Sequence, residues 1–207
     1  MNLQKRLQTI LKKNLLNLNE RQQQQLIIFM ELIIRWNKVF NLTAITDPDE
    51  MIYLHLIDSL IISPYLKGQH LLDVGTGAGL PGIPLAILNP EQYWVLLDKS
   101  SKKTRFLTQV IAELGLKRIE VIHVRCEDFQ PTQCFDTILS RAFASLDLFT
   151  SATMHLLCDG GQWLAMKGKL PQDEMKELPN IFRVADVIPL HIEGISVERH
   201  LIRITRQ

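Results

Sequence analysis

The residues best suited to chemistry are the glycines of residues 73–82, which read Asp-Val-Gly-Thr-Gly-Ala-Gly-Leu-Pro-Gly. The stretch begins within HLLDVG, residues 70–75, whose apolar character predicts a short buried strand. Glycines let the backbone approach a ligand closely, and ligands of open α/β sheets bind beyond the carboxyl ends of the strands. The stretch therefore predicts a cofactor-binding loop, with a tight turn that binds nothing as the alternative.

Two acidic residues narrow the choice of ligand. Asp73 stands two positions before Gly75, and Asp98 ends the next predicted strand, residues 93–98. A carboxylate at the end of this second strand can accept hydrogen bonds from both ribose hydroxyls of a nucleoside. Residues 77–82 also satisfy the dinucleotide pattern G-x-G-x-x-G, but the leading D-x-G-x-G-x-G is similar to S-adenosylmethionine-dependent methyltransferases. An NAD(P)-dependent oxidoreductase and a non-enzymatic RNA-binding or assembly factor remain as alternatives.

Two more polar segments follow predicted strands. Residues 125–128 (Arg-Cys-Glu-Asp) come after the strand 119–124, and their backbone amides and one acid suit an adenine edge, or form a polar loop. Cys126 is not expected to be a nucleophile, because neither a paired cysteine nor an obvious base accompanies it. The strand 135–140 leads into residues 140–144 (Ser-Arg-Ala-Phe-Ala), where Arg141 is expected to bind phosphate or a purine edge, or to cap the strand.

Four residues of the N-terminal part are further candidates. His55 and Asp58 lie three positions apart and form either a pair near the cofactor or an ordinary polar pair on a helix. Asn37 and Asn41 lie at the end of a predicted helix, and we expect them to tie helix termini to the sheet rather than to touch substrate.

These candidates must be positioned by two kinds of segment. Apolar residues recur at helical spacing through the first 65 residues. Helix start signals stand at Asn19 and at Asp47-Pro48, and the helix that starts after Asp47 is expected to reach about residue 64. From residue 70, predicted strands alternate with helices at about 80–88, 101–114 and 145–158, up to a strand at 162–167. This alternation indicates βαβ units and a parallel sheet.

The last two strand patterns, residues 182–192 and 197–205, have no helix between them and predict an antiparallel pair that closes the sheet. We therefore expect one α/β domain over residues 1–207. It consists of an N-terminal helical segment, 1–65, and a cofactor-binding α/β core, 66–207.

The overall charge excludes a globally basic nucleic-acid binder, because 23 Lys and Arg face 22 Asp and Glu for a net charge of +1. Two local stretches are nevertheless basic. The first 13 residues contain Lys5, Arg6, Lys12 and Lys13 and no acid. Residues 99–118 contain Lys99, Lys102, Lys103, Arg105, Lys117 and Arg118 and the single acid Glu113. Taken alone, such stretches are usually solvated helix faces; with the RNA substrate that the family resemblance described below implies, we expect them to bind RNA phosphates.

The three cysteines, Cys126, Cys134 and Cys158, form an odd set without metal-ligand spacing. They predict neither a disulfide framework nor a zinc site, and they favour a reducing cytoplasm. The N-terminus lacks the apolar core of a signal peptide, and the most apolar run, residues 26–34, is too short to cross a bilayer. The sequence thus predicts a soluble cytoplasmic protein that contacts no membrane.

Seven segments closely resemble the bacterial small-subunit rRNA methyltransferase G family, also called glucose-inhibited division protein B. They are WNKVFNLTAITDP (36–48), HLIDS (55–59), DVGTGAGLPGIPLAI (73–87), LLDKSSKKTRFL (96–107), SRAFASL (140–146), LAMKG (164–168) and ERHL (198–201). The resemblance covers nearly the whole chain in order. It departs from the family at Ala78, where proline is frequent, and at Cys126, where a small or aliphatic residue is usual.

The resemblance implies a Rossmann-like class I methyltransferase fold with a seven-stranded, mostly parallel sheet, an antiparallel last strand and N-terminal helices. It also implies S-adenosylmethionine as cofactor and transfer to N7 of one guanine, position 527 in the usual rRNA numbering, in 16S rRNA of the small ribosomal subunit or its precursor. With the glycine loop, the expected cofactor-binding residues are Asp73, Gly75, Gly77, Gly79, Leu80, Asp98, Cys126, Glu127 and Arg141.

Guanine N7 carries a lone pair and no proton, so direct in-line transfer requires no general base. Catalysis then reduces to positioning and the exclusion of water. Guanidinium and ammonium groups that grip guanine O6 or flanking phosphates can supply the positioning. The candidates are Arg125, Arg141, Lys167, Arg199 and His200. We expect no metal and a monomeric enzyme.

Overall fold

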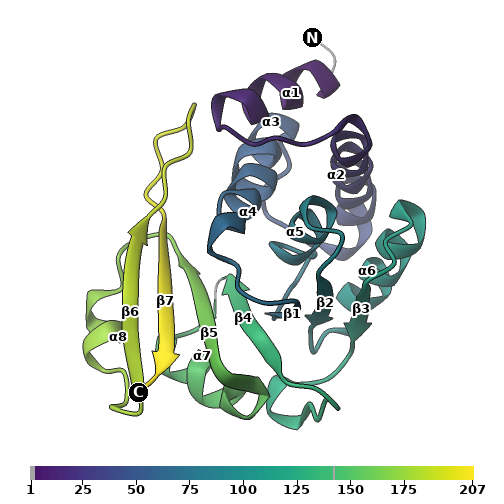
Figure 1. Cartoon of the computed structure of the whole chain (residues 1–207). Helices are drawn as coiled ribbons and strands as arrows, with labels where there is room; N and C mark the ends of the chain where they lie inside the picture. Colours follow the sequence, from purple (N-terminus) through teal and green to yellow (C-terminus); the bar gives the residue numbers. More distant parts are fainter. Residues whose placement is uncertain (1–2, 142) are drawn as a thin grey trace.

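A single mixed sheet forms the centre of the computed structural model, which describes residues 3–141 and 143–207. Within these residues the sheet has seven strands in the order β3-β2-β1-β4-β5-β7-β6 (Figure 1). The strands are β1 (His70–Val74), β2 (Tyr93–Leu97), β3 (Ile119–Ile122), β4 (Phe135–Arg141), β5 (Leu157–Lys167), β6 (Phe182–Pro189) and β7 (His200–Arg206). The helices of the core are α5 (Gly82–Leu88), α6 (Ser101–Leu114), α7 (Leu146–Thr153) and α8 (Gln172–Lys176).

The direction of the strands agrees with the sequence pattern. The first five strands are parallel, whereas β7 runs antiparallel to both of its neighbours, β5 and β6. The expected mostly parallel sheet with an antiparallel last strand is therefore confirmed. Because parallel strands end at the same edge, the residues that follow β1, β2 and β3 meet at one side of the molecule.

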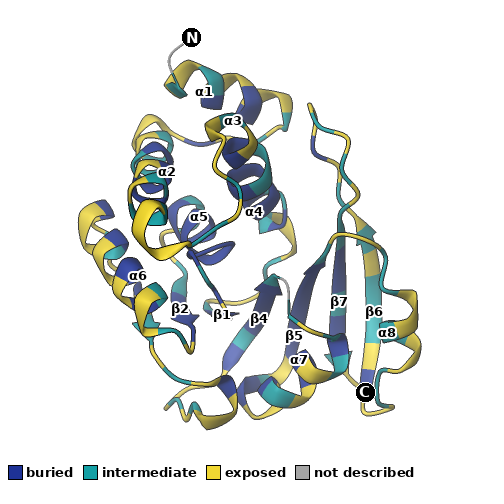
Figure 2. Cartoon of the chain, turned by 180° about the vertical axis from the view of Figure 1, so that it is seen from behind, coloured by how far each residue is buried: buried dark blue, intermediate teal, exposed yellow. Residues whose placement is uncertain are grey.

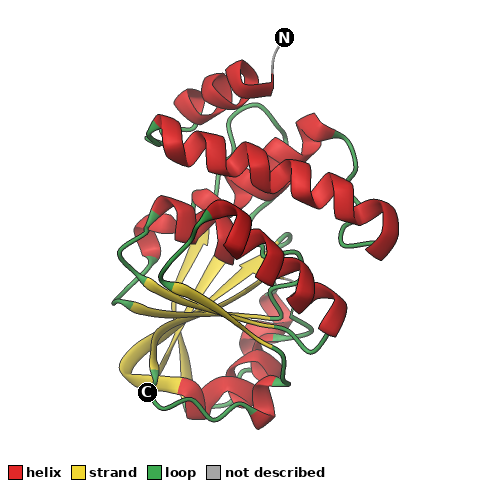
Figure 3. Ribbon diagram, turned by 90° about the vertical axis from the view of Figure 1, so that its right-hand side faces the viewer, coloured by secondary structure: helices red, strands yellow, loops and turns green. Residues whose placement is uncertain are grey.

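Alternate residues of each strand face two separate cores. Leu71 of β1 packs with the N-terminal helices, α5 and α6, whereas its neighbour Leu72 packs with α7 on the opposite face. Figure 3 shows the resulting layers, with α1 and α2 stacked over α5 and α6, then the sheet, then α7. Figure 2 shows that buried residues follow the strands and the inner sides of the helices.

The N-terminal helices α1 (Leu3–Lys13) and α2 (Glu20–Phe40) share the first of these cores. The start signal at Asn19 is confirmed, because its side chain accepts a hydrogen bond from Gln22 N at 2.9 Å. Gln22 Oε1 accepts one from Asn19 N in return, which completes a capping box. The buried side of α2 includes Phe29 and Ile33, in agreement with the helical spacing of apolar residues predicted for this part of the chain. The helical segment therefore covers one face of the sheet.

The helix that starts after Asp47 is less regular than expected. Instead of one helix to about residue 64, the chain forms α3 (Pro48–Met51), a π-helix (Ile52–Ile57), α4 (Asp58–Leu60) and a 3₁₀ turn (Ser63–Tyr65). In the π-helix the Asp58 N–H bonds to the carbonyl of Tyr53, five residues back. Such π-turns occur frequently at functional sites.

Strand β5 begins earlier than predicted, at Leu157 rather than at residue 162. The expected helix over 145–158 accordingly ends at Thr153 and is followed by a 3₁₀ turn, Met154–Leu156. The sequence Asp-Gly-Gly at 159–161 suggests a turn, but the structure accommodates it inside the strand, with Gly160 at φ +71° and an irregular register against β4. Glycine permits that conformation at no steric cost.

The prediction that the cysteines form no disulfide is wrong. Cys134 and Cys158 are bonded to each other, and Cys126 is the free cysteine of the described residues. The cause is strand register, because Phe135 of β4 pairs with Leu157 of β5 and thereby brings the two neighbouring cysteines together. A separation of 24 residues along the chain gives no sign of this contact.

Candidate functional site

The glycine loop between β1 and α5 adopts backbone angles that favour glycine. Gly75, Gly77 and Gly79 have φ values of +67°, +61° and +86°. A Cβ atom added to Gly75 would meet no atom within 4 Å, so this position borders open space. A Cβ on Gly79 would instead lie 2.6 Å from Ile83 and 2.7 Å from Leu107. Gly75 thus leaves open space beside the loop, whereas Gly79 allows close packing of α5 and α6.

Asp73 holds this loop from beneath. Its Oδ2 accepts hydrogen bonds from Thr76 Oγ1 at 2.7 Å and from Gly82 N at 2.9 Å. The side chain is fully buried, and burial raises the pKa of Asp73 to about 6. The structure therefore shows Asp73 shaping the loop, and its contact with a cofactor stays a prediction. Leu80 is also buried, and its contact with a cofactor likewise stays a prediction.

Asp98 follows β2 and faces the glycine loop. Its two oxygens accept hydrogen bonds from Gly77 N at 2.9 Å and from Ser100 N at 2.8 Å. Lys103 Nζ lies 3.6 Å from Asp98 Oδ2 and supplies an opposite charge. Each carboxylate oxygen keeps a second lone pair, so this fixed group can still accept hydrogen bonds from a ligand.

A cavity of about 250 Å³ brings together residues that follow the first three strands. It is lined by Val74, Gly75, Leu97, Asp98, Lys99, Lys103, Val124, Arg125, Cys126, Glu127 and Phe143. Four predicted cofactor residues, Gly75, Asp98, Cys126 and Glu127, therefore share one cavity with the predicted cation Arg125. Phe143 was not among the predicted site residues, although it stands two residues after Arg141. The residue between them, Ala142, lies outside the described residues.

The Cys126 thiol is unsuited to act as a nucleophile. Its Sγ donates a hydrogen bond to Glu127 Oε2 at 3.3 Å. Burial and the neighbouring Glu127 carboxylate raise the pKa of Cys126 to about 11, so the thiol stays protonated at neutral pH. The pKa of Glu127 is lowered, chiefly by a hydrogen bond from its own backbone N–H. These properties support the expectation that Cys126 is not a nucleophile.

Asp58 joins two of the predicted cations. Arg199 Nε donates to Asp58 Oδ1 at 2.8 Å, and Arg141 Nη1 lies 3.4 Å from Asp58 Oδ2. The same Arg141 nitrogen donates to the Leu54 carbonyl, inside the π-helix, at 3.0 Å. Asp58 is almost completely buried, whereas each arginine side chain keeps 25% of its surface exposed. The buried Asp58 carboxylate therefore orients two partly exposed guanidinium groups.

His55 does not pair with Asp58. Its Nε2 lies 3.0 Å from Thr43 Oγ1, and its Nδ1 is buried without a hydrogen-bond partner. Burial, followed by the charge of Arg141, lowers the pKa of His55 to about 4, so the ring is neutral at physiological pH. Asn37 exchanges two hydrogen bonds with the Thr43 backbone, and Asn41 caps α2. These asparagines close the helix end rather than reaching the sheet.

Lys167 and His200 face the other side of the sheet. They are paired across β5 and β7, and they alternate with Met166 and Leu201, which pack on the N-terminal face. Lys167 Nζ is bound by both oxygens of Glu174 on α8, at 3.0 and 2.8 Å. The structure therefore separates these two candidates from the cluster around Asp58.

Comparison with known proteins identifies the family. A family profile described as rRNA small subunit methyltransferase G matches residues 22–202. The chain is 50% identical to Ribosomal RNA small subunit methyltransferase G of Hydrogenovibrio crunogenus over 188 residues, 91% of this chain and 87% of that protein. Its 44% identity to the protein of the same name from Psychromonas ingrahamii spans 206 residues and 100% of both chains. The chain belongs to the rRNA small subunit methyltransferase G family.

Solved structures share the fold of this methyltransferase at low sequence identity. A glycopeptide N-methyltransferase complexed with S-adenosyl-L-homocysteine superposes with a TM-score of 0.64 at 12% identity, covering 74% of this chain and 87% of that one. The Pyrococcus abyssi tRNA (uracil-54, C5)-methyltransferase gives a TM-score of 0.55 at 15% identity, covering 77% and 39%. The predicted class I methyltransferase fold and family are confirmed.

The cavity of the methyltransferase has the features that an adenosyl group requires. Gly75 leaves space that a side chain would fill, and Asp98 offers fixed acceptor oxygens suited to ribose hydroxyls. Apolar side chains, among them Leu97 and Val124, line the same cavity. Among the described residues, no three His, Cys, Asp or Glu side chains gather as metal ligands do. In the same part of the chain, no helix is long and apolar enough to cross a membrane.

Proposed function

We propose that this chain methylates N7 of one guanine, position 527 in the usual rRNA numbering, in 16S rRNA. The observation that carries the proposal is the cavity in which Asp98, Gly75 and the segment after β3 converge in a chain of this family. The resemblance of seven segments to the family supports the choice of base and atom.

The donor group would lie between the ends of β1, β2 and β3. Gly75 and Gly77 would approach it through their backbone, Asp98 would accept its ribose hydroxyls, and Cys126 with Glu127 would border its adenine through backbone amides. S-adenosylmethionine supplies an electrophilic methyl group on its sulfonium sulfur. The role of this chain is to hold the guanine in line with that group and to exclude water.

The proposed reaction needs no general base, since guanine N7 carries a lone pair and no proton. The state of the acids around the cavity supports this view. Asp73 accepts hydrogen bonds from Thr76 and Gly82, Asp98 from Gly77 and Ser100, and Glu127 from the Cys126 thiol. Each of these acids thus has a structural role beside any contact with the cofactor, and the reaction requires none of them as a base, so positioning is the contribution that we assign to the chain.

Three arginines are the favoured positioning groups. Arg125 is exposed and lines the cavity, and Arg141 and Arg199 are oriented by Asp58. A guanidinium can hold guanine O6 or a flanking phosphate with two hydrogen bonds. We assign these groups to O6 or phosphate, because a cation on N7 itself would block the attack. Lys167 and His200 are less suited, since they lie on the opposite face of the sheet, where Lys167 binds Glu174 of α8.

The substrate would be 16S rRNA in the small ribosomal subunit or its precursor, and the enzyme would act as a monomer. A cytoplasmic location follows from that substrate. The cysteines do not add to this inference, because two of them form a disulfide.

Mapping of the modified nucleotide tests the proposal. The purified chain is incubated with labelled S-adenosylmethionine and small subunits that lack the modification, and the digested rRNA is analysed by mass spectrometry. We expect one 7-methylguanosine, at position 527. A label on another atom or another nucleotide would disprove the assignment, and no transfer at all would disprove the enzymatic role.

The positioning role is tested separately by Arg125→Ala and Arg199→Ala. At saturating cofactor, the rate of a single turnover should fall by about tenfold or more in each variant, as expected when a charged hydrogen bond is removed. Lys169→Ala serves as control, because Lys169 is exposed and belongs neither to the residues that line the cavity nor to the cluster around Asp58. Unchanged rates in both arginine variants would exclude these groups from positioning.

A further inference from the structure

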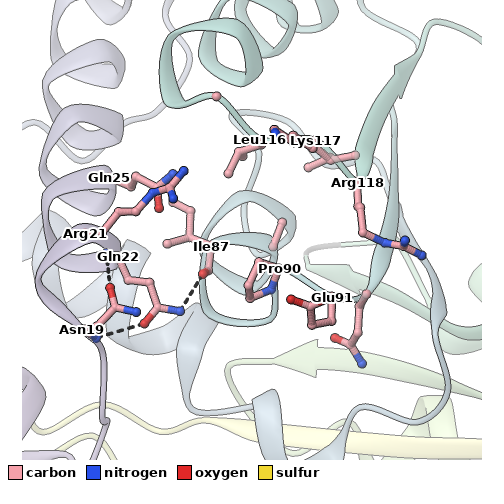
Figure 4. Close-up of a pocket in the computed structure, with 14 residues that line it drawn as sticks. Asn19, Arg21, Gln22, Gln25, Ile87, Pro90, Glu91, Leu116, Lys117 and Arg118 are labelled. Carbon is pink, nitrogen blue, oxygen red and sulfur yellow. Dashed lines mark hydrogen bonds between the residues drawn. The ribbon is translucent and has the colours of Figure 1, made fainter.

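A second cavity, of about 450 Å³, lies between the start of α2, the end of α5 and the loop that joins α6 to β3 (Figure 4). Since β2 and β3 begin here, it lies at the opposite edge of the sheet from the glycine loop. Neither the cofactor nor the proposed methyl transfer uses this cavity. Its lining residues are nevertheless of the types that bind nucleotides.

Three cations border the cavity. Arg21 comes from α2, whereas Lys117 and Arg118 come from the loop on the other side, as Figure 4 shows. All three are exposed, and within the described residues none of them forms an ion pair. Glu91 is the one acid among the residues lining the cavity. The local charge therefore remains positive and available to phosphate groups.

The walls of the cavity are held in place by side-chain amides of α2. Gln22 Nε2 donates to the carbonyls of Ile87 at 2.9 Å and Leu88 at 3.1 Å, and Gln25 Nε2 donates to Leu114 O at 2.8 Å. These bonds join α2 to the ends of α5 and α6. Pro90 and the partly buried Leu116 present apolar surface to the cavity (Figure 4). The cavity thus combines a fixed apolar wall with a cationic border.

Helix α6 connects this cavity to the cofactor site. It begins beside Asp98 and ends at Leu114, just before Lys117, and its 14 residues span about 21 Å. Lys102 and Arg105 are exposed near its start, and Glu113 is its one acid. An RNA backbone that follows α6 from the methylated base therefore meets basic groups at both ends of the helix.

We propose that this cavity binds a nucleotide of the substrate RNA about one helix length from the methylated guanine. Arg21, Lys117 and Arg118 would bind its phosphates, and Leu116 with Pro90 would contact its base or sugar. The inference rests on the proposed function, because it names a second contact for the same RNA. It makes α2 a part of the RNA-binding surface.

The test compares two double variants with equal loss of charge. Arg21→Gln/Lys117→Gln changes the cavity, whereas Lys176→Gln/Arg183→Gln changes exposed residues on α8 and β6. The dissociation constant for 16S rRNA is measured over a range of salt concentrations, and binding of S-adenosylhomocysteine is measured by calorimetry. Thermal unfolding of each variant checks that the fold is intact.

We expect the cavity variant to weaken RNA binding by about tenfold at low salt. The salt slope should fall by about 1 to 2, because each phosphate that the protein no longer neutralises reduces it by about 1. The control variant should keep the wild-type slope, and both should bind S-adenosylhomocysteine like wild type. Equal RNA binding by the two variants would overturn the proposal.

Free guanosine monophosphate is the second probe, since its phosphate could occupy the cavity without RNA. Saturable binding of this nucleotide to wild type, abolished in the cavity variant while RNA binding is kept, would make the cavity a site for free nucleotides and overturn the RNA assignment. If wild type neither binds nor methylates rRNA, the proposed function itself has failed. If wild type does both and the variants behave alike, only this inference has failed.

Discussion

Arg199 Nε lies 2.8 Å from Asp58 Oδ1, which joins the start of β7 to the N-terminal helices. The other oxygen of Asp58 faces Arg141 at the end of β4. One buried carboxylate therefore orients two guanidinium groups that come from distant parts of the chain. If the two arginines position the guanine as proposed, Asp58 is a positioning residue whose effect on RNA methylation passes through them.

Replacement of Asp58 tests this relationship. Asp58→Asn keeps an acceptor oxygen but removes the charge that holds both arginines, so we expect a loss of about 1–3 kcal/mol in the free energy of unfolding. The KM for RNA should rise and the single-turnover rate should fall, while the affinity for S-adenosylhomocysteine stays unchanged. Denaturant unfolding and kinetics measure these quantities, with the exposed Asp173→Asn as control. Full activity in a destabilised variant would limit Asp58 to a structural role.

Asp98 should control cofactor affinity. Its oxygens are fixed by Gly77 and Ser100, so Asp98→Ala removes an oriented acceptor for the ribose and also loosens the loop. Hydrogen bonds to charged groups contribute about 1.5–3 kcal/mol, which corresponds to about a 10-fold to 150-fold rise in the Kd of S-adenosylhomocysteine. Calorimetric titration measures the change, and Asp159→Asn on the surface is the comparison. An unchanged Kd would remove Asp98 from the cofactor site.

The raised pKa of Asp73 predicts that the free energy of unfolding depends on pH. Because burial raises its pKa from 3.8 to about 6, the folded chain binds this proton more tightly than the unfolded chain. Its contribution to the free energy of unfolding is full at low pH and is lost as pH rises through this window, by up to about 3 kcal/mol. Asp73→Asn lacks this loss, so its stability relative to wild type should increase between about pH 4 and pH 6. Urea unfolding at several pH values would reveal a constant difference if this view is wrong.

The bond between Cys134 and Cys158 should be measurable in the purified protein. Thiol titration of the unfolded, unreduced chain should find one thiol, that of Cys126, and three after reduction. Closing a loop of 24 residues predicts a loss of about 3 kcal/mol in the free energy of unfolding on reduction. The variant Cys134→Ser/Cys158→Ser should not respond to reductant. Three thiols before reduction would contradict the bond.

Local sequence signals predicted the parts of the site that depend on neighbouring residues. The glycine loop with Asp73, the acid at the end of β2 and the capping box at Asn19 are each encoded by short runs of sequence. The antiparallel last strand was also predictable, because a helix is missing between the last two strand patterns.

Contacts between distant segments could not be predicted. Asp58 is 83 residues from Arg141 and 141 residues from Arg199, and nothing in the local pattern links them. Lys167 and His200 were expected to position the substrate together with the arginines, but strand alternation turns them to the opposite face of the sheet. The disulfide depends in the same way on the register of β4 and β5.

The π-helix over Ile52–Ile57 sets the angular phase of everything that follows it on its helix. Each residue of an α-helix turns the chain by about 100°. The π-turn places one more residue in a turn than an α-helix does, because its hydrogen bond spans five residues rather than four. If the same residues formed a regular α-helix, Asp58 would therefore be rotated by about that angle, away from both arginines. The wide turn thus acts as a phase offset that aims the acid, and its loss would uncouple the N-terminal helices from the strand ends without changing any side chain of the cluster.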